Sequence, residues 1–196
     1  IILFLVWIAS LCALAIILSL QLSVYSNREL TEKRVVLNPA PETLWIAPMK
    51  KQADISYDKF ASADDFRFFL DTANDRLYAS ADLNIYGSDT TSGYISVERQ
   101  AASNSESEAR DLARKVEYSW KLSGDTLYLD EYFSLPAGSR WNGSLVDIDV
   151  RLPEGTIIRM VEGALPASLK FSTWDPEARA WQIKDGDLSR LDDYTG

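Results

Sequence analysis

Histidine is absent from this chain of 196 residues, and cysteine occurs once, at Cys12. Without an imidazole, Ser-His-Asp and Cys-His hydrolysis, His-ligated zinc and haem with a proximal His are all excluded. A single cysteine also excludes an intrachain disulfide and any cysteine-cluster metal site. We therefore expect a protein without a cofactor, without a metal and without enzymatic activity.

Positive charge is also scarce, because 20 Lys and Arg residues face 29 Asp and Glu residues, for a formal net charge of −9. Nucleic-acid binding depends on clustered positive charge that neutralises phosphates. The composition therefore predicts that nucleic acid is not a partner of this protein.

Charged residues are missing altogether from residues 1–27, and the run Ile1–Leu20 is apolar apart from Ser10 and Ser19. As a helix, this run would span roughly 30 Å, the thickness of the hydrocarbon core of a bilayer. A cleaved signal peptide would have a basic start and a shorter apolar run, and a lipoprotein signal would have a small residue before Cys12. A buried helix of a soluble domain would show a polar stripe. We therefore predict a transmembrane helix over residues 1–24, in contact with membrane lipid.

The orientation of this helix is only weakly indicated by the charges that follow it. Arg28, Lys33 and Arg34, offset by Glu29 and Glu32, favour a cytoplasmic position for the downstream domain when they are read alone. The chain begins with Ile inside an apolar run, so we expect a longer polypeptide whose earlier segment sets the orientation.

Beyond the helix, the chain changes to short segments with β character. Residues 25–65 are predicted to form a connector with short strands, since the prolines of Asn38–Pro41 interrupt two apolar runs. The stretch Leu77–Tyr86 alternates apolar and polar residues, which is typical of a half-buried strand. The turn Gly87–Gly93 leads to a second alternating stretch, Tyr94–Glu98, which we expect to return beside the first.

One helix is predicted after these strands. Ser105 and Glu108 fit a reciprocal capping box, and the apolar residues behind them repeat at helical spacing: Ala109, Leu112, Ala113 and Val116. The small alanines indicate close packing of this helix against a sheet.

Alternation then resumes in a predicted hairpin of Tyr118–Leu122 with Thr126–Leu135. Two further strands are predicted at Ser144–Leu152 and Thr156–Val161. Residues 66–163 are therefore predicted to form a mainly β core of stacked antiparallel strands, as a β-sandwich or ladder, with one short helix. Residues 164–196 are predicted to form a less regular, acidic segment that contains Trp174 and Trp181.

Part of the sequence resembles a known family. The block EARDLARKVEYSWKLSGDTLYLDEYFSLPAGSRWNGSLVDIDVRLPEGTII (Glu108–Ile158) is similar to the outer domain of phage-shock protein C (PspC)-type membrane proteins of the Bacteroidetes. The tail Trp181–Leu188 resembles their closing W-x-M-T-x-x-G-L, with Ile183, Lys184 and Asp187 in place of the Met, the Thr and the Gly. The resemblance covers residues 66–190.

The resemblance implies a membrane-anchored β domain of the toast-rack ladder type, on the periplasmic side of the bacterial inner membrane. It also implies a role in envelope-stress sensing through contact with protein partners in the inner membrane or periplasm. A homo-oligomer is a further expectation for such a scaffold.

Aromatic side chains are the candidates for a partner surface, with packing in the core as the competing and favoured interpretation. The candidates are Tyr78, Tyr86, Tyr94, Trp120, Trp174 and Trp181. No residue is predicted to be catalytic, to bind a cofactor or to bind a metal.

Two acidic patterns could still carry chemistry. Asp147 and Asp149 lie on one side of the predicted strand, about 7 Å apart. Because the other side of that strand is purely aliphatic, we interpret the pair as a solvent-facing surface rather than as an acid/base or cation site. The segment Asp89–Ser92 contains oxygen ligands suited to Ca²⁺, but a plain turn between two glycines explains it better.

Three functions are compatible with the sequence. The first is a membrane-anchored domain that acts as a protein-interaction scaffold or as an envelope-stress sensor, and we favour it. The second is a surface adhesin or a structural subunit of a larger membrane complex. The third is a carboxylate-dependent glycosidase, which would need two carboxyl groups in one cleft.

Overall fold

The computed structural model describes residues 2–23, 27–49, 54–63, 66–139, 141–161 and 180–191. Within these ranges the chain forms two helices and fourteen strands. In chain order they are α1 (Ile2–Ser23), β1 (Asn27–Leu37), β2 (Thr43–Pro48), β3 (Lys59–Ala63), β4 (Phe66–Asp71), β5 (Arg76–Ser80), β6 (Asp82–Ser88), β7 (Gly93–Ser103), α2 (Glu106–Lys115), β8 (Trp120–Ser123), β9 (Thr126–Leu129), β10 (Tyr132–Leu135), β11 (Leu145–Pro153), β12 (Ile157–Met160), β13 (Ala180–Lys184) and β14 (Asp187–Arg190).

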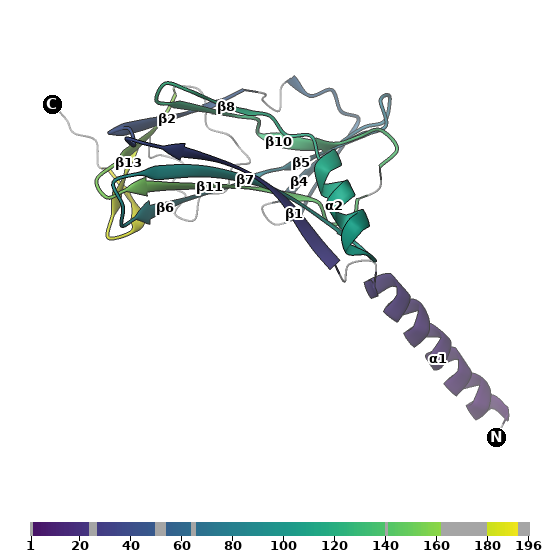
Figure 1. Cartoon of the computed structure of the whole chain (residues 1–196). Helices are drawn as coiled ribbons and strands as arrows, with labels where there is room; N and C mark the ends of the chain where they lie inside the picture. The colour runs from purple at the N-terminus through teal and green to yellow at the C-terminus, as the bar shows by residue number, and fades with distance from the viewer. Residues whose placement is uncertain are drawn as a thin grey trace.

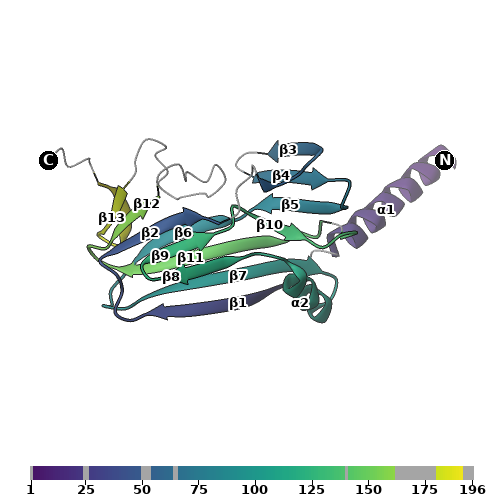
Figure 2. The same ribbon diagram turned by 90° about the horizontal axis from the view of Figure 1, so that it is seen from above.

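The strands form three sheets. Sheet A has the order β1-β7-β11-β6, sheet B the order β14-β13-β12-β2-β9-β8 and sheet C the order β10-β5-β4-β3. Figure 1 shows sheet A beneath the strands of sheet B, and Figure 2 shows sheet C beside them. The predicted mainly β fold is confirmed. The predicted antiparallel stacking holds for most strand pairs, but β11 with β6, β12 with β2 and β2 with β9 are parallel pairs, so sheets A and B are mixed.

The hydrophobic core is formed by the inward-pointing residues of the strands, which alternate with outward-pointing ones. On sheet A they include Leu83, Val97 and Ile148, all with no exposed surface. The members of the same cluster from sheets B and C are also at inward positions: Leu44, Ile46, Leu127, Leu129, Ile158, Trp181, Ile183, Ala79 and Phe133. Removing this apolar surface from water is the main stabilising contribution to the fold.

β11 occupies the middle of sheet A. Its Ile148 lies opposite Leu83 of the parallel strand β6 and opposite Val97 of the antiparallel strand β7. The predicted hairpin between Leu77–Tyr86 and Tyr94–Glu98 is therefore wrong, since β11 separates the two strands. Inserting β11 there lets its inner row of large aliphatic residues be buried between apolar rows on both sides.

Two stretches that were predicted as single strands pass from one sheet to another. β5 and β6 belong to sheets C and A, and β9 and β10 belong to sheets B and C. The N–H of Ala81 donates to the carbonyl oxygen of Glu131 at 3.4 Å, so the two crossing points lie side by side. The alternation of apolar residues continues through both points and therefore does not reveal the change of sheet.

The segments before and after the predicted β core also contribute strands to its sheets. The predicted connector, residues 25–65, supplies β1 to sheet A and β2 to sheet B. In the predicted less regular segment 164–196, β13 and β14 form a hairpin that extends sheet B beyond β12. Trp181 of this hairpin is only 1% exposed and belongs to the core. A single buried tryptophan among charged residues is too weak a periodic signal to predict these strands.

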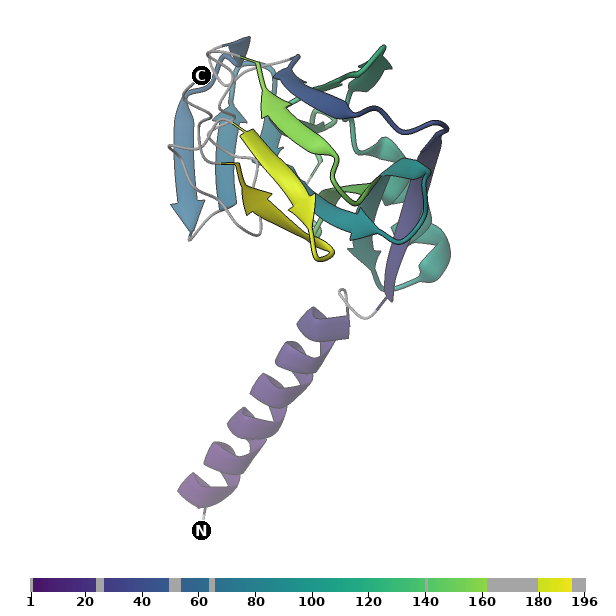
Figure 3. The ribbon, with the colours of Figure 1, turned by 90° about the vertical axis from the view of Figure 1, so that its left-hand side faces the viewer.

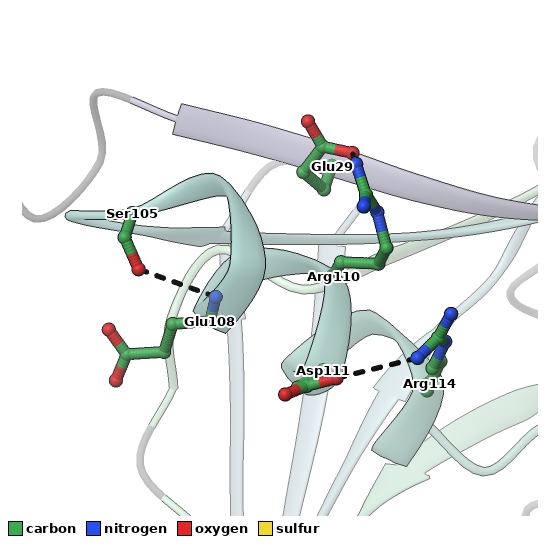
Figure 4. Close-up of polar contacts among 6 residues, drawn as sticks. All are labelled: Glu29, Ser105, Glu108, Arg110, Asp111 and Arg114. Atoms are coloured by element: carbon green, nitrogen blue, oxygen red, sulfur yellow. Dashed lines mark hydrogen bonds and ion pairs between the residues drawn. The ribbon is translucent and has the colours of Figure 1, made fainter.

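The predicted second helix is confirmed as α2. The Ser105 side chain caps it by accepting a hydrogen bond from the backbone N–H of Glu108 at 3.3 Å, as Figure 4 shows. The Glu108 carboxylate accepts instead from the hydroxyl of Ser103, so the reciprocal half of the predicted capping box is not formed. Ala109 and Ala113 are fully buried and allow the helix to pack closely on β7 and β1.

The predicted N-terminal helix is confirmed as α1, which Figures 1 and 3 show projecting away from the sheets. Large apolar side chains along it are exposed, among them Trp7 and Ile16. Within the described residues, a membrane-spanning helix is not identified.

The central position of Ile148 generates a stability prediction. Ile148→Val should lower the free energy of unfolding by about 0.5–1.5 kcal/mol. Ile148→Asp should prevent folding, because an unpaired buried carboxylate costs several kcal/mol against a total stability of about 5–15 kcal/mol. The matched control is Val161→Asp, since Val161 is 39% exposed just after β12 and this variant should lose less than about 1 kcal/mol. Thermal unfolding of the full chain in detergent measures all three, and a normally folded Ile148→Asp variant would contradict the assigned strand faces.

Candidate interaction surface on the outer face of sheet A

The outer face of sheet A consists of the residues of its four strands that point away from the core. The register places them in rows across the sheet, in the order β6, β11, β7, β1. The aromatic row is Tyr86, Arg151, Tyr94 and Val36; the middle row is Asn84, Asp149, Ser96 and Arg34; the acidic row is Asp82, Asp147, Glu98 and Glu32. Neighbouring strands are about 4.8 Å apart, so each row is a ladder of side chains in mutual contact range.

The aromatic row is held by cation–π contacts. The Arg34 guanidinium carbon lies 3.6 Å from the ring centroid of Tyr94, and the Arg151 guanidinium carbon lies 5.3 Å from that of Tyr86. Such contacts contribute about 0.5–1 kcal/mol at exposed sites. Two tyrosines and two arginines therefore form an ordered strip along one end of the outer face.

The acidic row places four carboxylates side by side. Burial raises the pKa of Asp147 to about 6, and the charges of Asp82, Asp149 and Glu98 add to the effect. Burial also raises the pKa of Glu98, with further contributions from Asp149 and Glu32. The row therefore binds a proton more readily than isolated carboxylates do, and Asp147 is the group that takes it up near pH 6.

Hydrogen bonds from neutral side chains partly compensate this repulsion. Asn84 donates to Asp149 at 3.1 Å, Gln100 donates to Asp147 at 3.1 Å and the Ser96 hydroxyl donates to Glu32 at 2.8 Å. Among the residues that the structure describes, no group of acidic residues, cysteine or histidine has the arrangement of a metal site. The outer face is thus a polar sheet surface whose carboxylates accept hydrogen bonds from neighbouring side chains.

The structure separates the six aromatic candidates. Tyr78 is 9% exposed and packs with Phe69 in a small apolar cluster, and Trp181 lies in the main core, so neither is on the surface. Trp120 is half-buried on the inner side, with the Lys33 ammonium 5.5 Å from its ring centroid. Trp174 lies outside the described residues.

Only Tyr86 and Tyr94 are brought together on the outer face. Sequence reasoning missed their partners Arg34 and Arg151, and also the alignment of Glu98 with Asp147. Period-two alternation placed these side chains away from the core, but the insertion of β11 between β6 and β7 decided which of them are neighbours.

The segment Asp89–Ser92, which was weighed as a Ca²⁺ site, forms hydrogen bonds within a turn. The hydroxyl groups of Ser88 and Thr90 lie 2.9 Å apart, and the Thr90 hydroxyl donates to the carbonyl oxygen of Ser92 at 2.8 Å. These bonds use the hydroxyl groups within the turn itself.

The fold and this face define a stacked-sheet β domain that is joined to an N-terminal helix. Residues 70–192 match the toast-rack domain found in some PspC proteins. Because the match covers more than half of the chain, the chain belongs to this PspC-associated toast-rack family, and the resemblance seen in the sequence is confirmed. No curated protein and no solved structure matches the chain.

The acidic row generates a pH-dependent prediction. The pKa of Asp147 is about 6 in the folded protein and near its ordinary value of 3.8 in the unfolded chain. Folding therefore takes up a proton between these values, and this group contributes more stability as the pH falls from 7 towards 4. Asp147→Asn should raise the midpoint of thermal unfolding at pH 7–8, and the difference from the wild type should vanish near pH 4.

The matched control is Asp125→Asn, because Asp125 is exposed in the turn between β8 and β9. This variant should follow the wild type at every pH, since its carboxylate faces no acidic row. Unfolding followed by tryptophan fluorescence from pH 4 to pH 8 measures the difference. An Asp147→Asn variant that also follows the wild type throughout would contradict the prediction.

Proposed function

We propose that this chain is a membrane-anchored toast-rack domain on the periplasmic side of the bacterial inner membrane, where it senses envelope stress by protein contact. The observation that carries the proposal is that an uncharged helix, α1, precedes the first strand of a sheet whose outer face is polar and is not covered by any other described helix or strand. In this proposal the domain works without catalysis.

The properties of α1 support the role of an anchor. Its 22 residues contain no charged side chain, and at ~1.5 Å per residue they span roughly 33 Å. The large apolar side chains of Val6, Trp7 and Ile16 are 58–61% exposed, and such surface is favourable in lipid. The hydroxyl of Ser10 donates to the carbonyl oxygen of Val6 at 3.0 Å, which satisfies the polar atom inside the helix.

The outer face of sheet A supports the role of a contact surface. Among the described helices and strands, sheets B and C pack on the inner face of sheet A, α2 lies against β7 and β1, and the β13–β14 hairpin lies against β6. α2 packs on the inner side, where Arg110 pairs with Glu29 at 2.9 Å (Figure 4). Tyrosine and arginine, the residues of the aromatic row, are enriched in protein interfaces.

The compartment is tested with reporters fused after Gly196 of the full chain. We expect an active alkaline phosphatase fusion and a non-fluorescent fusion of a cytoplasmic fluorophore. We also expect the chain to stay in the membrane pellet at high pH, whereas Leu11→Lys with Leu14→Lys should release it, because a charge at the centre of a span costs about 2.5–3.5 kcal/mol. Phosphatase-negative, fluorescent cells would show that the basic residues after α1 set the orientation.

The contact surface is tested by photocrosslinking in cells. A photoreactive phenylalanine analogue at Tyr94 should crosslink to a protein partner, and the yield should change when the envelope is stressed. The control position is Lys121, which is exposed on β8 at the edge of sheet B. Equal yields at both positions, with no response to stress, would contradict the proposed function.

A further inference from the structure

β1 is the longest free strand edge in the described part of the chain. It has 11 residues, whereas the edge strands of sheets B and C have four or five. The opposite edge of sheet A, β6, is approached by the β13–β14 turn, where the N–H of Gly87 donates to the carbonyl oxygen of Gly186 at 2.8 Å. A long free edge presents a row of unpaired backbone N–H and C=O groups that another strand can join.

The outer side chains of β1 have a self-complementary order. After Arg28, at the start of the strand, they read Leu30, Glu32, Arg34 and Val36, so that an acid and a base lie between two apolar residues. Leu30 is 50% exposed and Val36 is 64% exposed. We infer that β1 pairs antiparallel with β1 of a second copy of this chain, with Lys33 opposite Lys33.

In this register the outer side chains from Leu30 to Val36 match across the two copies. Leu30 lies opposite Val36 of the partner, and Glu32 lies opposite Arg34 of the partner, each contact occurring twice. Opposite charges and apolar pairs directly across neighbouring strands both stabilise a sheet. The interface is isologous, because the same strand of each copy contributes both halves of every pair.

Neighbouring registers are disfavoured by like charges. A two-residue slip, which keeps the same face of each sheet outward, places Glu32 opposite Glu32 in one direction and Arg34 opposite Arg34 in the other. Like charges directly opposite one another destabilise strand pairing. The sequence of β1 thus favours one register of the β1–β1 pair over its neighbours.

The inner side of β1 tolerates this arrangement. The Lys33 ammonium lies over the ring of Trp120 in sheet B, and this contact holds it towards its own domain instead of towards the partner's lysine. Thr31 comes opposite Val35, two β-branched residues that favour strands. The inference uses only the edge of β1. Because α1 precedes β1, antiparallel pairing places the α1 helices of the two copies at opposite ends of the paired strands.

The pairing is tested by exchanging the charges at positions 32 and 34 of the full chain, which is studied in detergent under reducing conditions. Glu32→Arg alone places Arg opposite Arg34, and Arg34→Glu alone places Glu opposite Glu32. Each single variant should weaken the Kd for self-association about tenfold. Sedimentation, or energy transfer between labelled chains, measures the association.

The decisive sample is the mixture of the two single variants. One chain then carries two basic residues and the other two acidic residues, so they should associate with each other as tightly as the wild type does. The double variant, Glu32→Arg with Arg34→Glu, should also associate with itself. Because both rescued samples contain the substitutions that weaken the single variants, misfolding cannot imitate this pattern.

Three results would overturn the inference. They are a wild-type chain that stays monomeric up to about 100 μM, single variants that associate as the wild type does, and a mixture that fails to restore association. None of these results affects the crosslinking at Tyr94 or the reporter fusions, so the failure of this inference and the failure of the proposed function are distinguishable.

Discussion

The insertion of β11 between β6 and β7 is the constraint on which the rest of the structure depends. It creates the buried row of Leu83, Ile148 and Val97, all without exposed surface. Because side chains alternate along each strand, the same insertion necessarily aligns Asp147 with Asp82 and Glu98 on the other face. The apolar row and the acidic row are therefore two consequences of one pairing, and the stability of the first offsets the repulsion in the second.

The acidic row shows how the pKa of a carboxyl group on a sheet surface is raised without a cleft. Each carboxylate is ordinary in the sequence, and the pairing of four strands, β6, β11, β7 and β1, brings them to neighbouring positions. Partial burial then raises the pKa of Asp147 above that of an isolated surface carboxylate, and the neighbouring charges of Asp82, Asp149 and Glu98 add to the effect. A surface of this kind couples its charge to pH, and any partner that covers it will be sensitive to the same protons.

β1 links three properties of the molecule. It follows the uncharged helix α1, it forms the outermost strand of sheet A and it carries the self-complementary side chains on a free edge. The Arg110–Glu29 ion pair and the buried alanines of α2 hold its first half from the inner side. β1 therefore lies in the chain between α1 and the rest of sheet A and contributes to both the edge and the outer face of that sheet.

The sequence by itself determined the elements whose signal is local. The uncharged run predicted α1, the capping residue Ser105 and the helical spacing of Ala109 and Ala113 predicted α2, and period two predicted β11 with its aliphatic face buried. The motifs in Glu108–Ile158 and Trp181–Leu188 also indicated the PspC-associated toast-rack family, because such motifs belong to the sequence and do not depend on tertiary contacts. Tertiary structure alone decided which strands are neighbours, since alternation is the same for every partner strand. It therefore decided the parallel pairs, the burial of Trp181, the contact of Arg34 with Tyr94 and the alignment of the acidic row, all of which depend on long-range pairing.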